Sequence, residues 1–177
     1  RIGLGRTLYE VGSLLSANGQ LHVRLLKEYF ETQEKRRPPG TAVNPSERLF
    51  HGIALILSGD SEGGLSRLDA VIAQGEKAKP WLGQALAWKG FAGKDRKENW
   101  RLANDQGPEA ADWVSYLRCR AGQAKDVPAG GSPMRNRLRV ATLACMGKAT
   151  EALAAAQAIA PKAADQVDSI PALSGDA

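Results

Sequence analysis

The chain has 177 residues, of which 43% are hydrophobic, 24% charged and 6% aromatic, and its formal net charge is +5 at pH 7. This composition excludes disordered, collagen-like and disulfide-dense chains, and the length suits one domain. No purely apolar run exceeds five residues, whereas a membrane-spanning helix needs about 20, so we expect no membrane span. Because the sequence begins at Arg1, we expect a processed or truncated N-terminus, and periplasmic, envelope and cytoplasmic locations all stay open.

Helical periodicity dominates the chain. Apolar residues recur at steps of three and four, and no long segment alternates as a strand does. Glycine, proline and asparagine stand where the runs begin or end. The pattern predicts helices near residues 4–18, 20–35, 45–58, 61–75, 79–91, 95–105, 109–121, 134–146, 148–159 and 161–168. Most connections are short, which makes neighbouring helices antiparallel and predicts an all-α fold of about nine or ten short helices stacked as hairpins.

One helical domain is expected over residues 1–168. The residues from 169 to 177 lack a helical pattern and are expected to form a C-terminal tail. Within the domain, the clearest loop lies over 126–133, because two prolines and two glycines fall in that segment.

Small residues and turn glycines recur at related positions. When Gly59 is aligned on Gly147, Gly64 falls on Ala152, and apolar residues before and after them also coincide. A small residue on each helix lets two backbones approach closely, and a glycine between the helices supplies a turn with positive φ. The positions predicted to pack the repeats are Gly12, Gly19, Gly52, Gly59, Gly64, Gly147 and Ala152.

This pattern resembles the tetratricopeptide repeat, most clearly over residues 45–72 and 138–160. That family has a small residue midway along its first helix, a turn glycine, and an alanine at the close-packing point of its second helix. The resemblance implies a superhelix of stacked hairpins with a concave groove for a peptide or helix, and some family members act in secretion or envelope assemblies. An unrelated all-helical bundle is the alternative fold.

The two cysteines, Cys119 and Cys145, lie in apolar surroundings. They form no CxxC motif and no cysteine–histidine metal spacing, so no metal site is predicted. Two states stay open. They are buried free thiols, or they form one disulfide between neighbouring helices, which would favour an oxidising compartment.

Tryptophans are the most suggestive candidates for partner binding. Tryptophan is enriched at interface hot spots, and basic side chains beside it would suit an acidic peptide or a terminal carboxylate. The candidate groove residues are Trp81, Trp88, Trp100, Trp113, Lys89 and Arg96, with Lys94 and Lys97 nearby. Packing of these indoles in the helical core is the alternative interpretation.

Motifs of catalysis and cofactor binding are absent from the sequence, so neither an enzyme nor a cofactor is predicted. His51 lies on a predicted packed helix and is interpreted as structural. Glu109 and Asp112 are interpreted as charges that favour a helix start.

The sequence thus predicts a non-catalytic protein–protein interaction module, an adaptor or chaperone-like scaffold. A helical accessory region of a larger enzyme is one alternative. Nucleic-acid binding is the other, through a basic cluster formed by Arg118, Arg120, Lys125, Arg135, Arg137 and Arg139. Base-readout motifs and an aromatic stacking platform are missing, and this disfavours the nucleic-acid alternative.

Overall fold

The computed structural model describes residues 19–93 and 95–159, and this part of the chain is helical, without strands. Its eight α-helices are α2 (Gly19–Lys35), α3 (Pro45–Leu57), α4 (Ser61–Ile72), α5 (Lys79–Ala92), α6 (Arg96–Asn104), α7 (Pro108–Arg120), α8 (Pro133–Cys145) and α9 (Ala149–Ile159), and a 3₁₀ helix, η1 (Gly75–Ala78), precedes α5. The all-α prediction is therefore confirmed. The helices predicted over 4–18 and 161–168, with Gly12 and the tail, lie outside the described residues, so the count of nine or ten stays a prediction.

Side-chain caps fix several helix starts. The Asn44 side chain accepts a hydrogen bond from the Ser46 backbone N–H at 3.0 Å, and Pro45 occupies the first turn of α3. Asp60 accepts from the Gly63 N–H at 2.9 Å at the start of α4. These bonds satisfy backbone donors that have no partner inside the helix.

Glycines let α3 and α4 pack as a tight hairpin. Gly59 turns the chain between them with φ of +94°. A Cβ added to Gly64 would lie 2.5 Å from Ile56 Cγ1 and 2.7 Å from the Gly52 carbonyl oxygen. Only glycine therefore fits at Gly64 while the two helices keep this separation.

The α8–α9 hairpin has the same kind of turn. Gly147 connects the two helices with φ of +75°, and Ala152 is buried on α9. Gly19, which the sequence places at the end of a preceding helix, is the first residue of α2.

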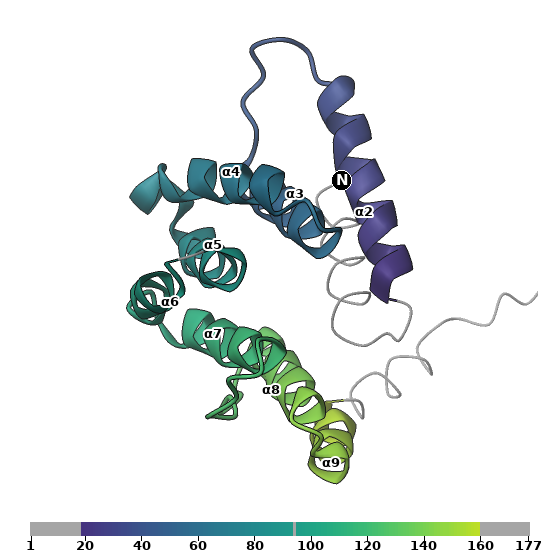
Figure 1. Ribbon diagram of the computed structural model, residues 1–177, viewed down its shortest axis with the longest axis vertical. Helices are drawn as coiled ribbons and strands as arrows, with labels where there is room; N and C mark the ends of the chain where they lie inside the picture. Colours follow the sequence, from purple (N-terminus) through teal and green to yellow (C-terminus); the bar gives the residue numbers. More distant parts are fainter. Residues whose placement is uncertain (1–18, 94, 160–177) are drawn as a thin grey trace, which may run out of the picture.

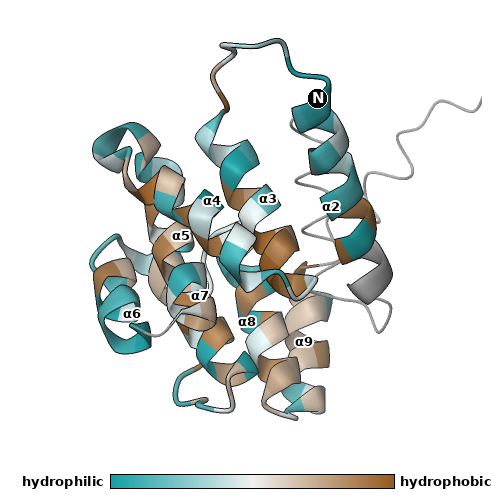
Figure 2. Ribbon diagram, turned by 45° about the horizontal axis from the view of Figure 1, so that its top comes forward, coloured by the Kyte–Doolittle hydropathy of each residue, from teal (hydrophilic) through white to brown (hydrophobic). Residues whose placement is uncertain are grey.

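The helices follow one another along a bent path, from α2 through α3 and α4 to α9 (Figure 1). Helix α5 lies in the middle and packs against α3, α4, α6 and α7. Apolar residues are most frequent on α3, α5 and α9, whereas α6 and the outer part of α2 are hydrophilic (Figure 2). The hydrophobic core thus runs along the row of helices, through the part of the chain around α5.

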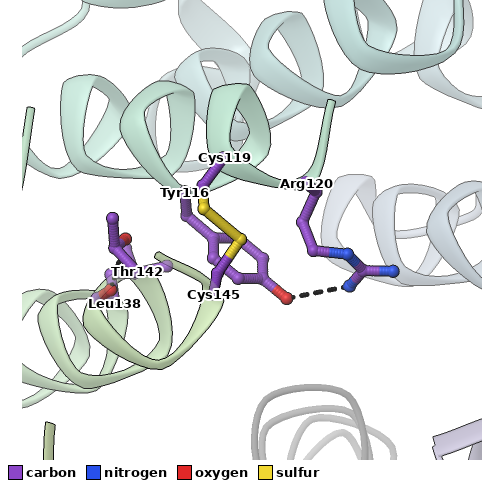
Figure 3. Close-up of a disulfide and its surroundings, with 6 residues drawn as sticks. All are labelled: Tyr116, Cys119, Arg120, Leu138, Thr142 and Cys145. Carbon is purple, nitrogen blue, oxygen red and sulfur yellow. Dashed lines mark hydrogen bonds between the residues drawn. A yellow bond between two sulfur atoms is a disulfide. The ribbon is translucent and has the colours of Figure 1, made fainter. Parts of the chain in front are cut away.

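A disulfide joins Cys119 on α7 to Cys145 at the end of α8 (Figure 3). Of the two states that the sequence leaves open, the structure contains the bridge. Cys145 is exposed, although its apolar neighbours in the sequence favour burial. The bridge joins two residues that lie 26 positions apart and encloses the whole loop between α7 and α8.

That loop is also held by α8. Arg139 donates hydrogen bonds to the carbonyl oxygens of Pro128 and Ala129 at 3.3 and 3.2 Å. The Gly131 N–H donates to the Asn136 side chain at 2.8 Å. The loop thus has a defined path, which matters because its first residues border the site described next.

Candidate functional site

Three of the four tryptophans lie in the core. Trp88, Trp100 and Trp113 are only 2%, 2% and 1% exposed, whereas Trp81 is half-buried. Trp88 packs tilted against Trp113 with ring centres 6.0 Å apart. Core packing, the alternative interpretation of the tryptophans, therefore accounts for most of the surface of these three indoles, and their role in partner binding stays a prediction.

One cleft of about 720 Å³ opens beside Trp100, between the start of α6, the end of α7 and the first residues of the following loop. We call it the basic cleft. Its lining includes the cations Arg96, Lys97, Arg118 and Lys125.

Trp100 anchors the basic cleft. Its indole N–H donates to the Ala87 carbonyl oxygen of α5 at 3.0 Å, which fixes the ring. The guanidinium carbons of Arg96 and Arg118 lie 5.5 and 5.4 Å from the ring centre, the distance of a cation–π interaction. Arg96 also donates to two carbonyl oxygens at the end of α5, whereas Arg118 forms no salt bridge within the described residues.

The charges around the basic cleft do not balance. Four cationic side chains face two acidic ones, Asp95 and Glu98, a formal excess of +2. Glu98 is already engaged, because Arg101 donates two hydrogen bonds to it and thereby lowers the pKa of its carboxyl group. Two guanidinium groups beside one aromatic ring repel each other, and a bound anion would offset that repulsion. The arrangement thus favours a bound carboxylate or another anion.

Lys89 takes no part in this cleft. Its ammonium group lies 2.7 Å from an Asp69 carboxylate oxygen on α4, so its role is to hold α5 to α4. The grouping of Lys89 with Arg96 as partner-binding residues stays a prediction, and the two side chains have different partners within the described residues. Lys94 lies outside the described residues.

The predicted basic cluster is divided by internal bonds. Arg120 donates to the Tyr116 hydroxyl at 3.0 Å (Figure 3), and Arg135 donates to the Asp112 carboxylate at 2.6 Å. Arg139 binds loop carbonyls, as described above. Arg118 and Lys125 line the basic cleft, so the six cations do not act as one free patch.

His51 is buried on α3 and stacks on Phe30 of α2, with ring centres 5.5 Å apart. Burial lowers the pKa of its imidazole, with a further contribution from the nearby charge of Arg67. Arg67 forms a salt bridge with Glu34 at 2.7 Å and lowers the pKa of that carboxyl group by its hydrogen bond. The geometry matches the structural role interpreted from the sequence.

Asp112 differs from the sequence-based interpretation. Glu109 lies in the first turn of α7, but Asp112 is 6% exposed and pairs with Arg135 of α8. It therefore connects two helices and does not serve as a partner of the helix dipole.

Over the described residues, no cluster of three or more histidine, cysteine, aspartate or glutamate side chains is placed to hold a metal ion. No helix in residues 19–93 and 95–159 has both the length and the apolar character needed to cross a membrane. Comparison of the chain with protein-family models, curated proteins and solved structures gives no match.

Proposed function

We propose that the chain is a non-catalytic, TPR-like interaction module that binds an acidic segment of another protein in the basic cleft. The observation that carries this proposal is the pair of guanidinium groups, Arg96 and Arg118, placed over Trp100 with an excess of positive charge around them. Complementary charge accelerates encounter and selects partners, and a fixed aromatic ring adds contact area.

The hairpin packing supports the TPR-like part of the proposal. The close approach at Gly52 and Gly64, the turn at Gly59 and the related turn at Gly147 agree with the positions of that repeat. Stacked hairpins present long surfaces to extended partners. An adaptor or chaperone-like role follows from such a surface.

The disulfide supports an oxidising compartment for this module. Such bridges form and persist in secreted and periplasmic proteins and are rare in the cytosol. A place in a bacterial envelope or secretion assembly agrees with the bridge between Cys119 and Cys145.

The proposal is tested by fluorescence anisotropy with a labelled 12-residue peptide rich in glutamate and aspartate. The matched peptide carries glutamine and asparagine at the same positions. We expect the acidic peptide to bind at least about tenfold more tightly, a difference of about 1.4 kcal/mol. Equal binding of both peptides, or binding of neither, would contradict the proposal.

Arg118→Glu is expected to weaken the acidic peptide about tenfold, because it reverses a charge beside Trp100. Lys148→Glu is the control, since it makes the same change in charge next to α9 at an exposed site paired with Glu151. Equal loss in both variants would mean that net charge alone drives binding.

Duplex DNA of mixed sequence serves as the competing ligand. Binding to DNA weakens with salt by about 0.9 log units in K per log unit of salt for each phosphate contact. Tighter binding of DNA than of the acidic peptide at 150 mM salt would replace the proposal with nucleic-acid binding.

A further inference from the structure

The disulfide lies at the helix turn that supplies a cation to the basic cleft. Cys119 directly follows Arg118 in the last turn of α7, and Cys145 is the last residue of α8. The salt bridge between Asp112 and Arg135 joins the same two helices nearer to their starts. The disulfide is thus a covalent link between α8 and the turn that carries Arg118.

The last turn of α7 also fixes the start of the following loop. The Gly122 N–H donates to the Cys119 carbonyl oxygen at 2.9 Å, and the Gln123 N–H donates to the Arg118 carbonyl oxygen at 2.8 Å. Gly122 has φ of +70°, as glycines that end helices commonly do. Gln123 and Lys125 then line the basic cleft. A displacement of this turn would therefore move Arg118 and both loop residues of the cleft.

Helix ends open more readily than helix interiors, because their last carbonyl groups have no partner inside the helix. Arg118 is half-buried, and its contact with Trp100 is a single cation–π interaction at 5.4 Å. Such a contact is weak and depends on the position of the guanidinium group over the ring. A covalent link one residue away therefore helps to hold Arg118 beside Trp100.

The two sulfur atoms differ in exposure. Cys119 is only 8% exposed, whereas Cys145 is exposed at the end of α8 (Figure 3). Exposed disulfides react with thiols more readily than buried ones. A thiol in solution can thus reach the Cys145 side of the bridge while the chain stays folded.

We propose that the bridge between Cys119 and Cys145 is a redox switch of the basic cleft, which binds an acidic segment tightly only when the two cysteines are joined. This inference rests on the proposed function of the basic cleft and adds its regulation. A chain made with free thiols then gains full affinity only after oxidation, which agrees with a role in an oxidising compartment.

Closure of the bridge uses a disulfide donor as the oxidant. The Cys145 thiolate attacks one donor sulfur, forms a mixed disulfide and releases the other donor sulfur as a thiolate. The Cys119 thiolate then attacks Cys145 Sγ and releases the second donor sulfur. The two cysteines lose two electrons, their two thiol protons pass to the donor, and the donor leaves as a dithiol. A dithiol reductant reverses both steps.

The first test needs no binding partner. The side-chain N–H signals of ¹⁵N-labelled full chain are compared before and after reduction with dithiothreitol, and circular dichroism at 222 nm reports the helix content. We expect the Trp100 signal to move, the Trp88 signal to stay in place, and the helix content to be retained. An unmoved Trp100 signal would overturn the inference. A general loss of helix would also overturn it, because the bridge would then hold the whole fold.

The second test measures the affinity for the acidic 12-residue peptide by fluorescence anisotropy. Reduction with dithiothreitol, which carries no charge, is expected to weaken binding at least about tenfold. Gly64→Ala is the control for a loss of stability, because it strains the packing of α4 and leaves the bridge intact. This variant should keep the affinity of the oxidised wild type, and an equal loss in it would overturn the inference.

The same titrations distinguish the two proposals. Equal affinities of the oxidised and reduced chains would overturn the redox switch and leave the proposed function standing. An oxidised chain that does not bind the acidic peptide would contradict the proposed function, and the switch with it.

Arg118→Gln tests whether the bridge acts through Arg118. In this variant, reduction should weaken the peptide less than threefold, because the cation that the bridge positions is already absent. Arg24→Gln, at an exposed position of α2, is the matched control and should keep the full effect of reduction. A tenfold effect of reduction in Arg118→Gln would overturn the assigned role of Arg118.

Discussion

The guanidinium carbon of Arg118 lies 5.4 Å from the centre of the Trp100 ring, so a cation near the end of α7 lies beside the indole of α6. The same ring receives Arg96 from its own helix, and its N–H is fixed by the backbone of α5. Three helices thus build one cationic aromatic site. Its geometry supports binding of an acidic partner.

Loss of the disulfide is expected to destabilise the chain by about 3 kcal/mol. The bridge joins residues 26 positions apart, and closing a loop of that length restricts the unfolded chain by an amount of this order. Urea unfolding of the oxidised protein and of the Cys119→Ser/Cys145→Ser variant measures the difference. The reduced wild-type protein serves as the control, and it should match the double variant. Equal midpoints for oxidised and reduced protein would contradict the stabilising role.

Gly64→Ala is expected to lower the free energy of unfolding by about 1–3 kcal/mol, although alanine is the better helix former. The added Cβ would meet Ile56 Cγ1 at 2.5 Å and the Gly52 oxygen at 2.7 Å. Ser66→Ala, at an exposed position of the same helix, is the control and should be close to neutral. Thermal or urea denaturation measures both variants, and a stabilised Gly64→Ala protein would show that α3 and α4 are not packed this closely.

Stability is expected to fall as the pH drops below 6.5, because of His51. Burial lowers the pKa of His51 from its ordinary value of 6.5, so the unfolded chain binds a proton more readily than the folded one in this window. Each pKa unit by which the folded and unfolded chains differ corresponds to about 1.4 kcal/mol in the free energy of unfolding. The salt bridge of Glu34 stays intact in this window, since its lowered pKa places its protonation below 4.5.

His51→Leu isolates that contribution. The variant removes the titrating ring at similar volume. The free energy of unfolding of the wild type minus that of the variant should therefore fall from pH 8 to pH 5. Urea titrations at several pH values measure this difference. A difference that is constant over that range would contradict the lowered pKa.

Arg135→Gln is expected to cost about 2–4 kcal/mol. It leaves the buried Asp112 carboxylate without its cationic partner at 2.6 Å, and an uncompensated buried charge is strongly destabilising. Arg24→Gln, which breaks an exposed pair with Glu28 on α2, serves as the matched substitution and should have a smaller effect. Similar losses in the two variants would show that Asp112 does not depend on the ion pair. Denaturation at pH 7 is the measurement.

The positions of the helices could be predicted from the sequence because the residues that determine them lie within each helix or next to it. Apolar periodicity together with Asn44, Pro45 and the turn glycines predicts each described α-helix to within three residues of its ends, although not the 3₁₀ helix η1. The close packing at Gly52 and Gly64 can also be predicted from the sequence, since small residues recur at fixed spacing within one hairpin.

The basic cleft was harder to predict from the sequence, because it depends on contacts between helices. Trp100 and Arg118 lie 18 positions apart, and only the turn between α6 and α7 brings them together. Tryptophan content alone indicated an aromatic groove, whereas burial assigns Trp88 to the core.

The side-chain N–H signals of the four tryptophans give the most direct test of the central claim, because each indole reports on a different place in the fold. In ¹⁵N-labelled protein titrated with the acidic peptide, the Trp100 signal should move, and the Trp88 signal should stay in place. Arg118→Glu should abolish the movement. A peptide that binds and leaves Trp100 unmoved would contradict the assignment of the basic cleft as the site for an acidic partner.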